Sequence, residues 1–426
     1  MLDLKFIRQN PALVQKAIGL KNIPLNLEDL LEADRLVGQV RRELQALETQ
    51  KNENAKLASK VSPDERKPLI QKGKELGGEI EKVRPRLGAA EAKLQEFLWL
   101  VPMIPSQDAP VGKSENDNVE LRRWGTPNEF GFTPRHHVDL LALNNWADLE
   151  RIGSVAGTRS YALKNDMVLL EWALHRFAME KLKAKGFTLI SLPAMAREFA
   201  FYGTGHFPTG RDQAYHLPED DLYLAGTAEV LANALHSGEI LKEADLPILY
   251  GAFSPCFRRE AGSSGKDTRG LIRVHQFSKV EQYVLCKNDA AESEHWHREL
   301  LKTSEEIVQE LELPYRVVDV CTGDMGAGKV RQFDIEAWVP SEQKYRETHS
   351  CSSLYDWQAR RVNVRYRDRG GVVKFCYTLN NTAVATPRIL VPLLENHQEP
   401  DGSVRVPRAL APYLSGVEKL IGRKDK

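Results

Sequence analysis

The chain has 426 residues, and its Lys plus Arg total of 59 equals its Asp plus Glu total. At roughly 100–200 residues per domain, this length allows two to four domains. An apolar content of 42% permits a buried core and excludes general disorder, and the zero net charge excludes a protein that coats nucleic acid indiscriminately. Any contact with nucleic acid must therefore come from local patches.

The cysteines are odd in number and scattered, and no two of them form a Cys-x-x-Cys pair. They are Cys256, Cys286, Cys321, Cys351 and Cys376. This pattern supports neither a disulfide framework nor a zinc ribbon, so we expect reduced thiols, a cytoplasmic protein and no zinc. The N-terminus lacks the basic and apolar blocks of a secretory signal, and the absence of any run of about 18 apolar residues predicts no membrane span.

Residues 28–98 carry two heptad-like runs of apolar side chains, over residues 30–61 and 69–97. Such spacing is typical of helices that bury a narrow seam. Ser62 and Pro63 break the pattern and supply an N-cap and a first-turn proline for the second helix. The two runs therefore predict an antiparallel helical hairpin, in which each arm of about 30 residues reaches about 45 Å.

Two uses of this hairpin arm fit the sequence. The first is a coiled coil for dimerisation or spacing, and the second is a lever that contacts a long partner. Basic residues gather around the turn, which suits a phosphate backbone but equally a solvated surface. They are Lys51, Lys56, Lys60, Arg66, Lys67, Lys72 and Lys74.

The rest of the chain has a different pattern. Residues 106–135 are rich in Pro and Gly, as a linker is, and helical stretches follow at about 166–185 and 289–312 among several short strand-like runs. Strands that follow one another without intervening helices predict an antiparallel sheet of α+β type. We therefore expect an N-terminal domain over residues 1–105 and a second domain over residues 106–426.

Residues 323–329 match the G-x-x-x-x-G-K pattern of a phosphate-binding P-loop. A P-loop also needs Ser or Thr at the next position and a helix whose N-terminus receives the phosphate. Here Val330 follows, and residues 331–339 alternate as a strand does. The segment is therefore predicted to be a Gly-rich turn between strands.

Residues 257–281 have a Gly/Ser-rich centre between two strand-like ends, which predicts a long hairpin loop. Arg258, Lys266, Arg269 and Arg273 give it positive charge. The planar fork of an arginine grips phosphate oxygens in two places, so the segment is a candidate phosphate site. A solvated basic loop is the alternative if this segment is taken alone.

Two later segments add to this candidate. Residues 380–396 read as a strand end that turns into a helix and carries Arg388, and residues 345–353 place Glu347 three positions before Ser350. In a regular strand these two side chains point to opposite faces, so a turn or bulge is needed before both can bind one metal ion. An ordinary polar strand is the alternative for the second segment.

In their order along the chain, these segments resemble motifs 2 and 3 of the class II aminoacyl-tRNA synthetases, and most closely the bacterial seryl-tRNA synthetase family. The resemblance covers essentially the whole chain. Besides the arm, it rests on residues 1–8, 227–229, 258–281, 322–326, 346–352 and 358–361. It implies an α+β catalytic domain built on an antiparallel sheet, with an N-terminal antiparallel coiled-coil hairpin arm.

The resemblance also implies an activity. A member of this family is a serine–tRNA ligase that activates L-serine with ATP and Mg²⁺ to seryl-adenylate, releases pyrophosphate, and transfers serine to tRNA(Ser), and often to tRNA(Sec), leaving AMP. Two anions meet in the first step, so positioned cations supply most of the catalysis. The family is a homodimer whose arm grips the long variable arm of tRNA(Ser).

By the same resemblance, Arg258 contacts the α-phosphate and the serine carboxylate, and Arg388 meets the γ-phosphate of a bent ATP. Phe277 stacks on adenine, and Glu260 holds its amino group. Glu347 and Ser350 are expected to bind Mg²⁺ as well as ATP. The remaining expected ATP contacts are Arg259, Val274, Thr348 and His349, with a structural role as the alternative for His349.

Serine recognition is expected at Thr227, Ala228, Glu229, Glu281 and Thr382, together with Arg258. An ammonium group needs a carboxylate and a hydroxyl needs a polar partner, so such a pocket rejects alanine and glycine. For Thr382 alone, a helix cap is the alternative.

Residues 187–193 resemble motif 1, the dimer-forming element. One departure from the family pattern is visible, because Pro387 stands before Arg388 where Gly is common. A proline fixes φ near −65°, which bears on the entry angle of Arg388 but leaves its guanidinium in place. Two other functions are kept as alternatives: a related ligase that loads a carrier protein, and a non-catalytic RNA-binding or scaffold protein.

Overall fold

The computed structural model describes residues 1–262, 265, 267 and 269–422, so predicted phosphate contacts at Lys266 lie outside the described residues. The chain divides into two compact units. The smaller one comprises residues 2–19 and 23–102, and the larger one comprises residue 1, residues 20–22 and residues 103–426. Within the described part of the chain, no helix is both long enough and apolar enough to cross a membrane.

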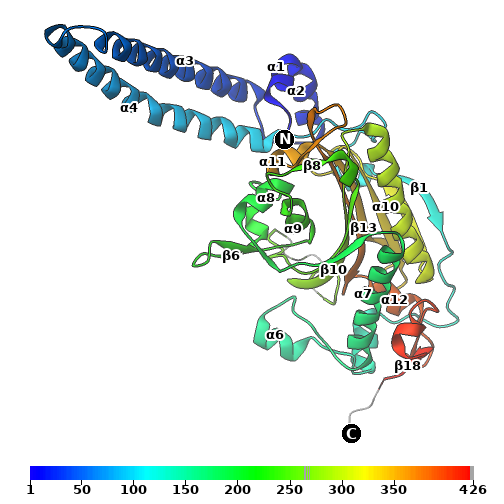
Figure 1. Ribbon diagram of the computed structural model, residues 1–426. Coiled ribbons are helices and arrows are strands. Elements are labelled where there is room, and N and C mark those ends of the chain that lie inside the picture. Colours follow the sequence, from blue (N-terminus) through cyan, green and yellow to red (C-terminus); the bar gives the residue numbers. More distant parts are fainter. Residues whose placement is uncertain (263–264, 266, 268, 423–426) are drawn as a thin grey trace. The chain divides into compact units, whose positions relative to one another are not determined.

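The smaller unit is entirely helical (Figure 1). Its helices are α1 (Leu4–Gln9), α2 (Pro11–Leu20), α3 (Leu27–Ala58) and α4 (Pro63–Leu100). Asp34 ties the short helices to the long ones, because its two carboxylate oxygens accept hydrogen bonds of 2.6 Å from Nε and Nη2 of Arg8. Ile7, Val14 and Leu30 are fully buried where these helices meet.

Helices α3 and α4 form the predicted antiparallel hairpin (Figure 1). The seam buries apolar side chains of both helices, among them Val37, Val40, Leu76, Ile80, Val83 and Leu94. Ser62 caps α4 in a capping box with Glu65, and Pro63 occupies the first turn, as the sequence predicts. Helix α4 continues without interruption through Pro68 and Pro85.

Asn54 is a polar residue inside this seam. It is buried, and its Nδ2 donates a hydrogen bond of 2.7 Å to the carbonyl oxygen of Leu69 on the facing helix. A buried, satisfied asparagine in a coiled-coil seam favours one register over others at some cost in stability. Arg86 and Glu43, 2.9 Å apart, form an ion pair across the same hairpin.

The larger unit is built on an eight-stranded sheet of order β1-β11-β12-β13-β16-β10-β9-β4. Neighbouring strands are antiparallel, except that β4 pairs with β9 in parallel. The strands are β1 (Val119–Trp124), β4 (Thr188–Ser191), β9 (Ile248–Phe257), β10 (Gln276–Cys286), β11 (Tyr315–Asp319), β12 (Arg331–Val339), β13 (Lys344–Tyr355) and β16 (Tyr377–Thr386). This sheet confirms the predicted α+β class.

Strand β1 lies inside the segment that the sequence presents as a linker. All six of its residues are exposed, so it lacks the alternating pattern that marks a half-buried strand. It is held at the edge of the sheet by pairing with β11. The linker interpretation is therefore wrong for Val119–Trp124.

Helices α7 (Asp166–Ala184) and α10 (Ala290–Glu310) pack against the central strands of the sheet and match the predicted helical stretches. On β10, Val280 and Val284 belong to the core that these helices close, and Gln282 donates 3.0 Å to Ser304 of α10. Side chains alternate along a strand, so Lys279 and Glu281 point to the opposite face of the sheet.

Shorter elements complete the larger unit. Its other helices are α5 (His137–Leu143), α6 (Glu150–Ala156), α8 (Glu198–Thr204), α9 (Glu229–Ala234), α11 (Trp357–Val362) and α12 (Leu390–Asn396). Its small sheets combine β2 (Ala147–Asp148) with β3 (Ala162–Leu163), β5 (Met195–Ala196) with β7 (Leu222–Leu224) and β6 (Tyr215–Leu217), β15 (Val373–Phe375) with β14 (Arg365–Arg367) and β8 (Ile240–Lys242), and β17 (Val404–Arg405) with β18 (Lys419–Leu420).

Candidate active site

A cavity of about 330 Å³ opens on the face of the sheet opposite α7 and α10. Its lining comes from β10, β13 and β16, from residues of α8, α9 and α11, and from nearby loops. Arg258, just after β9, and Arg388, just after β16, both line it. The two arginines that the sequence singled out therefore converge on one cavity, although 130 positions separate them.

Arg258 is fixed where it leaves the strand. Its Nε donates a hydrogen bond of 3.3 Å to the carbonyl oxygen of Gly226. Its guanidinium lies 5.2 Å from the ring centre of Phe277, within the range of a cation–π contact. An arginine held at a strand end in this way loses less freedom on binding a phosphate than one on a free loop.

Arg388 is held between two other segments of the lining. Its Nε donates 3.3 Å to the carbonyl oxygen of Ile272, and its Nη1 donates 3.4 Å to that of Glu347. Burial lowers the pKa of Arg388, the Glu347 carboxylate opposes this, and the charge of Arg258 lowers the pKa further. Each cation thus destabilises the charge of the other, and a polyanion between them relieves both.

Strand β13 carries the bulge that the spacing of Glu347 and Ser350 requires. Glu347 pairs with Glu336 and His349 pairs with Ile335, so Thr348 is an extra residue in the ladder. Beyond the bulge, Glu347 and Ser350 share one face, and both line the cavity. The predicted irregularity is confirmed.

Asp334 on β12 pairs with Ser350 on β13 and adds a second carboxylate to this corner. Gln332 Nε2 donates 2.8 Å to Asp334 Oδ1 and 3.0 Å to Ser350 Oγ. Burial, and then the charge of Glu347, raises the pKa of Asp334 to about 7. Two carboxylates and a hydroxyl that share one corner fit Mg²⁺, a hard ion that prefers oxygen ligands.

A second corner of the cavity is lined by Thr227, Glu281 and Thr382. Lys279 Nζ donates 2.7 Å to Thr227 Oγ1 and lies 2.5 Å from a carboxylate oxygen of Glu281. Burial raises the pKa of Glu281, and the charge of Lys279 opposes this rise. The corner therefore presents a carboxylate and hydroxyls in a place that excludes bulk water.

Glu229 lines the same part of the cavity and is held rigidly. Its Oε1 accepts hydrogen bonds from Gln358 Nε2 at 2.6 Å and from Asn380 Nδ2 at 2.9 Å. Gln358 is itself fixed, because its Oε1 accepts from Thr378 Oγ1 at 2.8 Å. These bonds hold the Glu229 carboxylate in one orientation.

Comparison with known proteins identifies the family that has this helical hairpin and this cavity. Residues 1–105 match the family model of the seryl-tRNA synthetase N-terminal domain, and residues 215–397 match that of the tRNA synthetase class II core domain (G, H, P, S and T). A serine–tRNA ligase of Deinococcus radiodurans is 54% identical, over 99% of both chains. The chain belongs to the seryl-tRNA synthetase family. It is therefore an aminoacyl-tRNA ligase.

Solved structures of this family agree with the assignment. The seryl-tRNA synthetase of Pyrococcus horikoshii, crystallised with ATP, is 40% identical, covers all of both chains and has a TM-score of 0.90. A cytoplasmic serine–tRNA ligase of Naegleria fowleri in complex with AMP is 29% identical, with coverage of 100% of this chain and 99% of its own, and a TM-score of 0.86.

Most of the predicted seryl-tRNA synthetase site residues meet in the one cavity. Its lining includes Thr227, Glu229, Arg258, Glu260, Val274, Phe277, Glu281, Glu347, Thr348, Ser350, Thr382 and Arg388. Glu260 is also paired with Arg273, whose Nη1 lies 3.1 Å from its carboxylate. The arrangement as a whole brings cations, carboxylates, hydroxyls and an aromatic ring around one space.

Three predicted residues do not line the cavity. Ala228 is fully buried, and the Arg259 guanidinium points to the ring of Tyr215 at 6.0 Å. His349 is buried behind its strand, where its Nε2 contacts the carbonyl oxygen of Ala383 at 3.0 Å. The geometry thus gives no side-chain contact with a cavity ligand at these positions, and for His349 it favours the structural alternative.

The lining also contains residues that sequence reasoning missed. Lys279, Asn380 and His206 all face the cavity. Lys279 lies two positions before Glu281, so both side chains point to the same face of the strand, and this spacing was visible in the sequence. Asn380 lies two positions before Thr382, again on the same strand, whereas His206 lies in a loop with no pattern to mark it.

The P-loop-like segment also forms part of this cavity. Residues 326–329 line it, and β12 rather than a helix follows, which confirms the predicted turn and rejects a Walker-type site. Three backbone carbonyls of the loop face Lys21. Its Nζ donates 3.3 Å to the oxygen of Gly326, 2.9 Å to that of Ala327, and also to that of Lys329. Burial, and then the charge of Lys329, lowers the pKa of Lys21.

Proposed function

We propose that the chain activates L-serine as seryl-adenylate and transfers it to tRNA(Ser) and tRNA(Sec), with the cavity as the site of activation. The observation that carries this proposal is the convergence of Arg258 and Arg388 on a space that also holds a carboxylate-and-hydroxyl corner around Glu281. An amino acid fits that corner and a triphosphate fits the two cations, so the reacting atoms meet between them.

Activation requires the serine carboxylate to attack the α-phosphorus of ATP. We assign Arg258 to both anions, because it is fixed beside Phe277 and Gly226 and its charge acts on both Glu281 and Arg388. No general base is needed, since the attacking carboxylate is already ionised. The guanidinium of Arg258 neutralises charge that builds up on the α-phosphate as the new bond forms and the bond to pyrophosphate breaks.

Arg388 is assigned to the γ-phosphate of a bent ATP, with Phe277 stacked on adenine and Glu260 at the adenine amino group. Glu347 and Ser350 would hold Mg²⁺, with Asp334 close by, and the bound ion would supply charge neutralisation to the pyrophosphate that leaves. Val274 and Thr348 complete the nucleotide lining.

The serine subsite is assigned to Glu281 and Thr227, with Thr382 and Glu229 as further polar contacts. The ammonium group of serine pairs with a carboxylate, and its hydroxyl replaces a hydrogen bond that alanine or glycine leaves unmade. The charge of Lys279 favours the ionised form of Glu281, because it opposes the rise that burial causes in the pKa of that carboxyl.

The hairpin arm is proposed to contact tRNA. Shape and backbone contact, rather than base edges, dominate recognition of helical RNA, so the hairpin is proposed to follow the long variable arm of tRNA(Ser). The basic residues near the turn suit this role. All five cysteines of the chain are free and buried, which fits the proposed cytoplasmic location.

A homodimer is also proposed. Trp172 is 65% exposed and Leu169 is 53% exposed on α7, three positions apart and so on one helix face. Large apolar side chains grouped on a surface mark protein interfaces. Sedimentation of the wild type as a dimer, and of Trp172→Glu as a monomer, supports this assignment; a monomeric wild type contradicts it.

Serine-dependent ATP–pyrophosphate exchange tests the activation step. We expect exchange with serine and none with alanine or glycine. No exchange with any amino acid would leave only the scaffold alternative. Exchange with serine but no charging of tRNA(Ser) would favour the carrier-protein alternative.

The tRNA role of the arm has its own test. The variant Lys56→Gln/Lys60→Gln/Lys72→Gln removes three exposed charges near the turn. We expect it to raise the KM for tRNA(Ser) several-fold while pyrophosphate exchange stays unchanged, because the cavity belongs to the other unit. Charging at the wild-type KM would contradict the proposed tRNA contact.

A further inference from the structure

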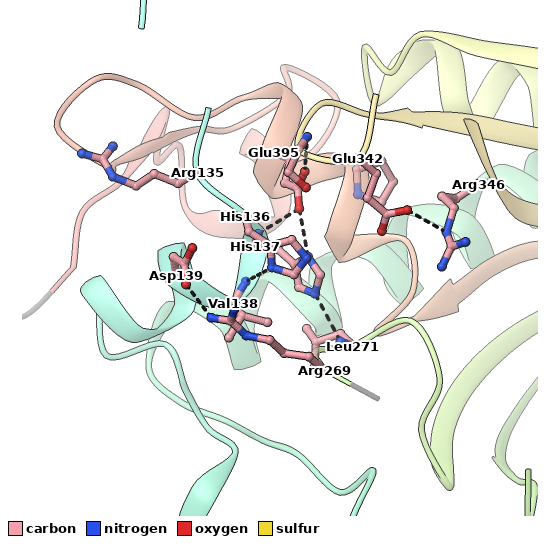
Figure 2. A network of polar contacts seen from close by, with 12 residues as sticks. Arg135, His136, His137, Val138, Asp139, Arg269, Leu271, Glu342, Arg346 and Glu395 are labelled. Carbon is pink, nitrogen blue, oxygen red and sulfur yellow. Dashed lines mark hydrogen bonds and ion pairs between the residues drawn. The ribbon is translucent and has the colours of Figure 1, made fainter. Parts of the chain in front are cut away.

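Glu395 and His137 contact one another (Figure 2), and both are fully buried. Neither residue lines the cavity. Glu395 lies on α12, and His137 is the first residue of α5. Oε1 of Glu395 accepts a hydrogen bond of 2.8 Å from the backbone nitrogen of His137. The same oxygen lies 2.9 Å from Nδ1 of the His137 ring. The other, Oε2, accepts from the backbone nitrogen of Ser341 at 3.0 Å.

The imidazole of His137 is held in one tautomer. Its Nε2 lies 3.3 Å from the backbone nitrogen of Leu271, which can only donate. Nε2 must therefore accept, and Nδ1 carries the proton that is donated to Glu395. The approach is close, because a Cβ on Gly270, whose φ is +92°, would lie 2.2 Å from Nε2. A residue larger than glycine at position 270 would push the imidazole away.

The imidazole of His137 contacts a segment that lines the proposed nucleotide end of the cavity. Leu271 and Ile272 both line the cavity, and the carbonyl oxygen of Ile272 accepts the hydrogen bond from Arg388 Nε. A chain of direct contacts therefore runs from Glu395 through His137 and residues 271–272 to Arg388. Glu395, His137 and Leu271 are fully buried, so the contacts of this chain before residue 272 are shielded from solvent.

Glu395 also reaches the other two elements that carry proposed ATP ligands. Helix α12 begins two residues after Arg388, so Glu395 shares a rigid segment with that arginine. Ser341 lies in the turn that leads into β13, the strand of Glu347 and Ser350. One carboxylate thus joins three segments whose relative positions set the shape of the nucleotide end.

The same residues have the composition of a metal site. Ligand atoms of His136, His137 and Glu395 lie within 4.8 Å of one another. However, both ring nitrogens of His137 are already engaged, and His136 Nδ1 accepts a hydrogen bond of 3.3 Å from Val138, as an N-cap does. The cluster is therefore complete without an ion and reads as a structural connection.

We propose that His137 and Glu395 are positioning residues for ATP, which set the placement of residues 271–272 and through them the orientation of Arg388. This inference rests on the proposed role of Arg388 at the γ-phosphate. It predicts that weakening the pair harms ATP more than serine, because the serine corner around Lys279 and Glu281 contains none of the three connected segments.

Two substitutions of His137 distinguish its contact with Glu395 from its contact with Leu271. His137→Gln can place an amide oxygen near the position of Nε2 and so keep the acceptor for Leu271. His137→Asn keeps a donor near Nδ1 for Glu395 but is too short to reach Leu271. His397→Asn is the matched control, because His397 is equally buried, two residues beyond Glu395, and bonds to the carbonyl of Leu311 instead of a cavity residue.

Pyrophosphate exchange and calorimetric ATP binding are measured for all three variants and the wild type. We expect His137→Asn to raise the KM and Kd for ATP at least five-fold with less than a two-fold change in the KM for serine. His137→Gln should recover most of this loss, and His397→Asn should show a lower Tm with unchanged ATP parameters.

Equal ATP affinity in His137→Asn and wild type, or equal losses in His137→Asn and His397→Asn, would overturn the inference. A wild type without serine-dependent exchange would overturn the proposed function instead. In that case the calorimetric comparison still decides whether the pair positions the ATP site.

Discussion

The ammonium group of Lys279 joins Thr227 to Glu281, with its Nζ 2.7 Å from Thr227 Oγ1 and 2.5 Å from a carboxylate oxygen of Glu281. Both ionisable groups are buried. A buried carboxylate without a cation takes up a proton, and a protonated Glu281 no longer attracts the ammonium group of serine. In the proposed serine subsite, Lys279 is therefore expected to act on amino-acid recognition through Glu281, without contacting serine itself.

Lys279→Met should raise the KM for serine at least ten-fold in pyrophosphate exchange and change the KM for ATP much less. Loss of one partner of a buried ion pair should also lower the free energy of unfolding by about 3–5 kcal/mol. The double variant Lys279→Met/Glu281→Gln is the control, because it removes both charges: it should recover stability but not serine binding. Recovery of serine binding in the double variant would contradict the role of Glu281.

Glu347→Gln should increase the Mg²⁺ concentration needed for half-maximal exchange about ten-fold, since one charged oxygen donor is lost from a site for a hard ion. Glu342→Gln, in the turn before the same strand, is the matched control, because Glu342 pairs with Arg346 at 3.4 Å and does not line the cavity. Equal Mg²⁺ titrations for Glu347→Gln and the wild type would place the ion elsewhere.

Lys21→Met should loosen the cavity-lining loop at residues 326–329. The substitution leaves three partly buried backbone carbonyl oxygens without the donor that Lys21 supplies, which costs about 1–3 kcal/mol of stability. We expect kcat for exchange to fall about ten-fold and backbone hydrogen exchange to accelerate in this loop. Lys16→Met, an exposed lysine of the neighbouring helix, should change neither quantity; an unaltered loop in Lys21→Met would refute the role of Lys21.

Acid should destabilise the protein through its buried histidines. Burial lowers the pKa of His175, His297 and His397 to about 4 in each case. The unfolded chain therefore binds more protons than the native state between about pH 6.5 and pH 4, so stability is lost as the pH falls through this window. Each histidine contributes about 1.4 kcal/mol per pH unit there.

Urea unfolding of the wild type at pH 7.5 and pH 5.0 measures this loss. His397→Gln should show a smaller loss than the wild type across the same pH interval, whatever its absolute stability. Parallel losses in the two proteins would mean that His397 is protonated in the native state, against the burial that lowers its pKa.

Local sequence patterns were sufficient to predict much of the fold. The heptad runs and the Ser62–Pro63 break define the hairpin, because helix periodicity and capping are local properties. Strand β1 escaped prediction, because its six residues are all exposed and it is held only by pairing with β11. No local pattern reports such an edge strand.

The site shows the same division. The spacing of Glu347 and Ser350 required a bulge, and Thr348 supplies it, so that feature was open to strand geometry. Asp334 joins them through cross-strand register, and Glu395 reaches His137 across 258 positions, so neither leaves a local signal. For Lys279, the sequence shows that it shares a strand face with Glu281, but it does not show that Thr227 is its hydrogen-bond partner.

The central claim is that Arg258 and Arg388 act on one triphosphate in one cavity. Serine-dependent ATP–pyrophosphate exchange by Arg388→Ala tests it most directly. We predict a fall of at least a hundred-fold, with an unchanged circular dichroism spectrum and Tm, since the loss removes a charge that acts on the transition state. Exchange by Arg388→Ala at near the wild-type rate would contradict the account.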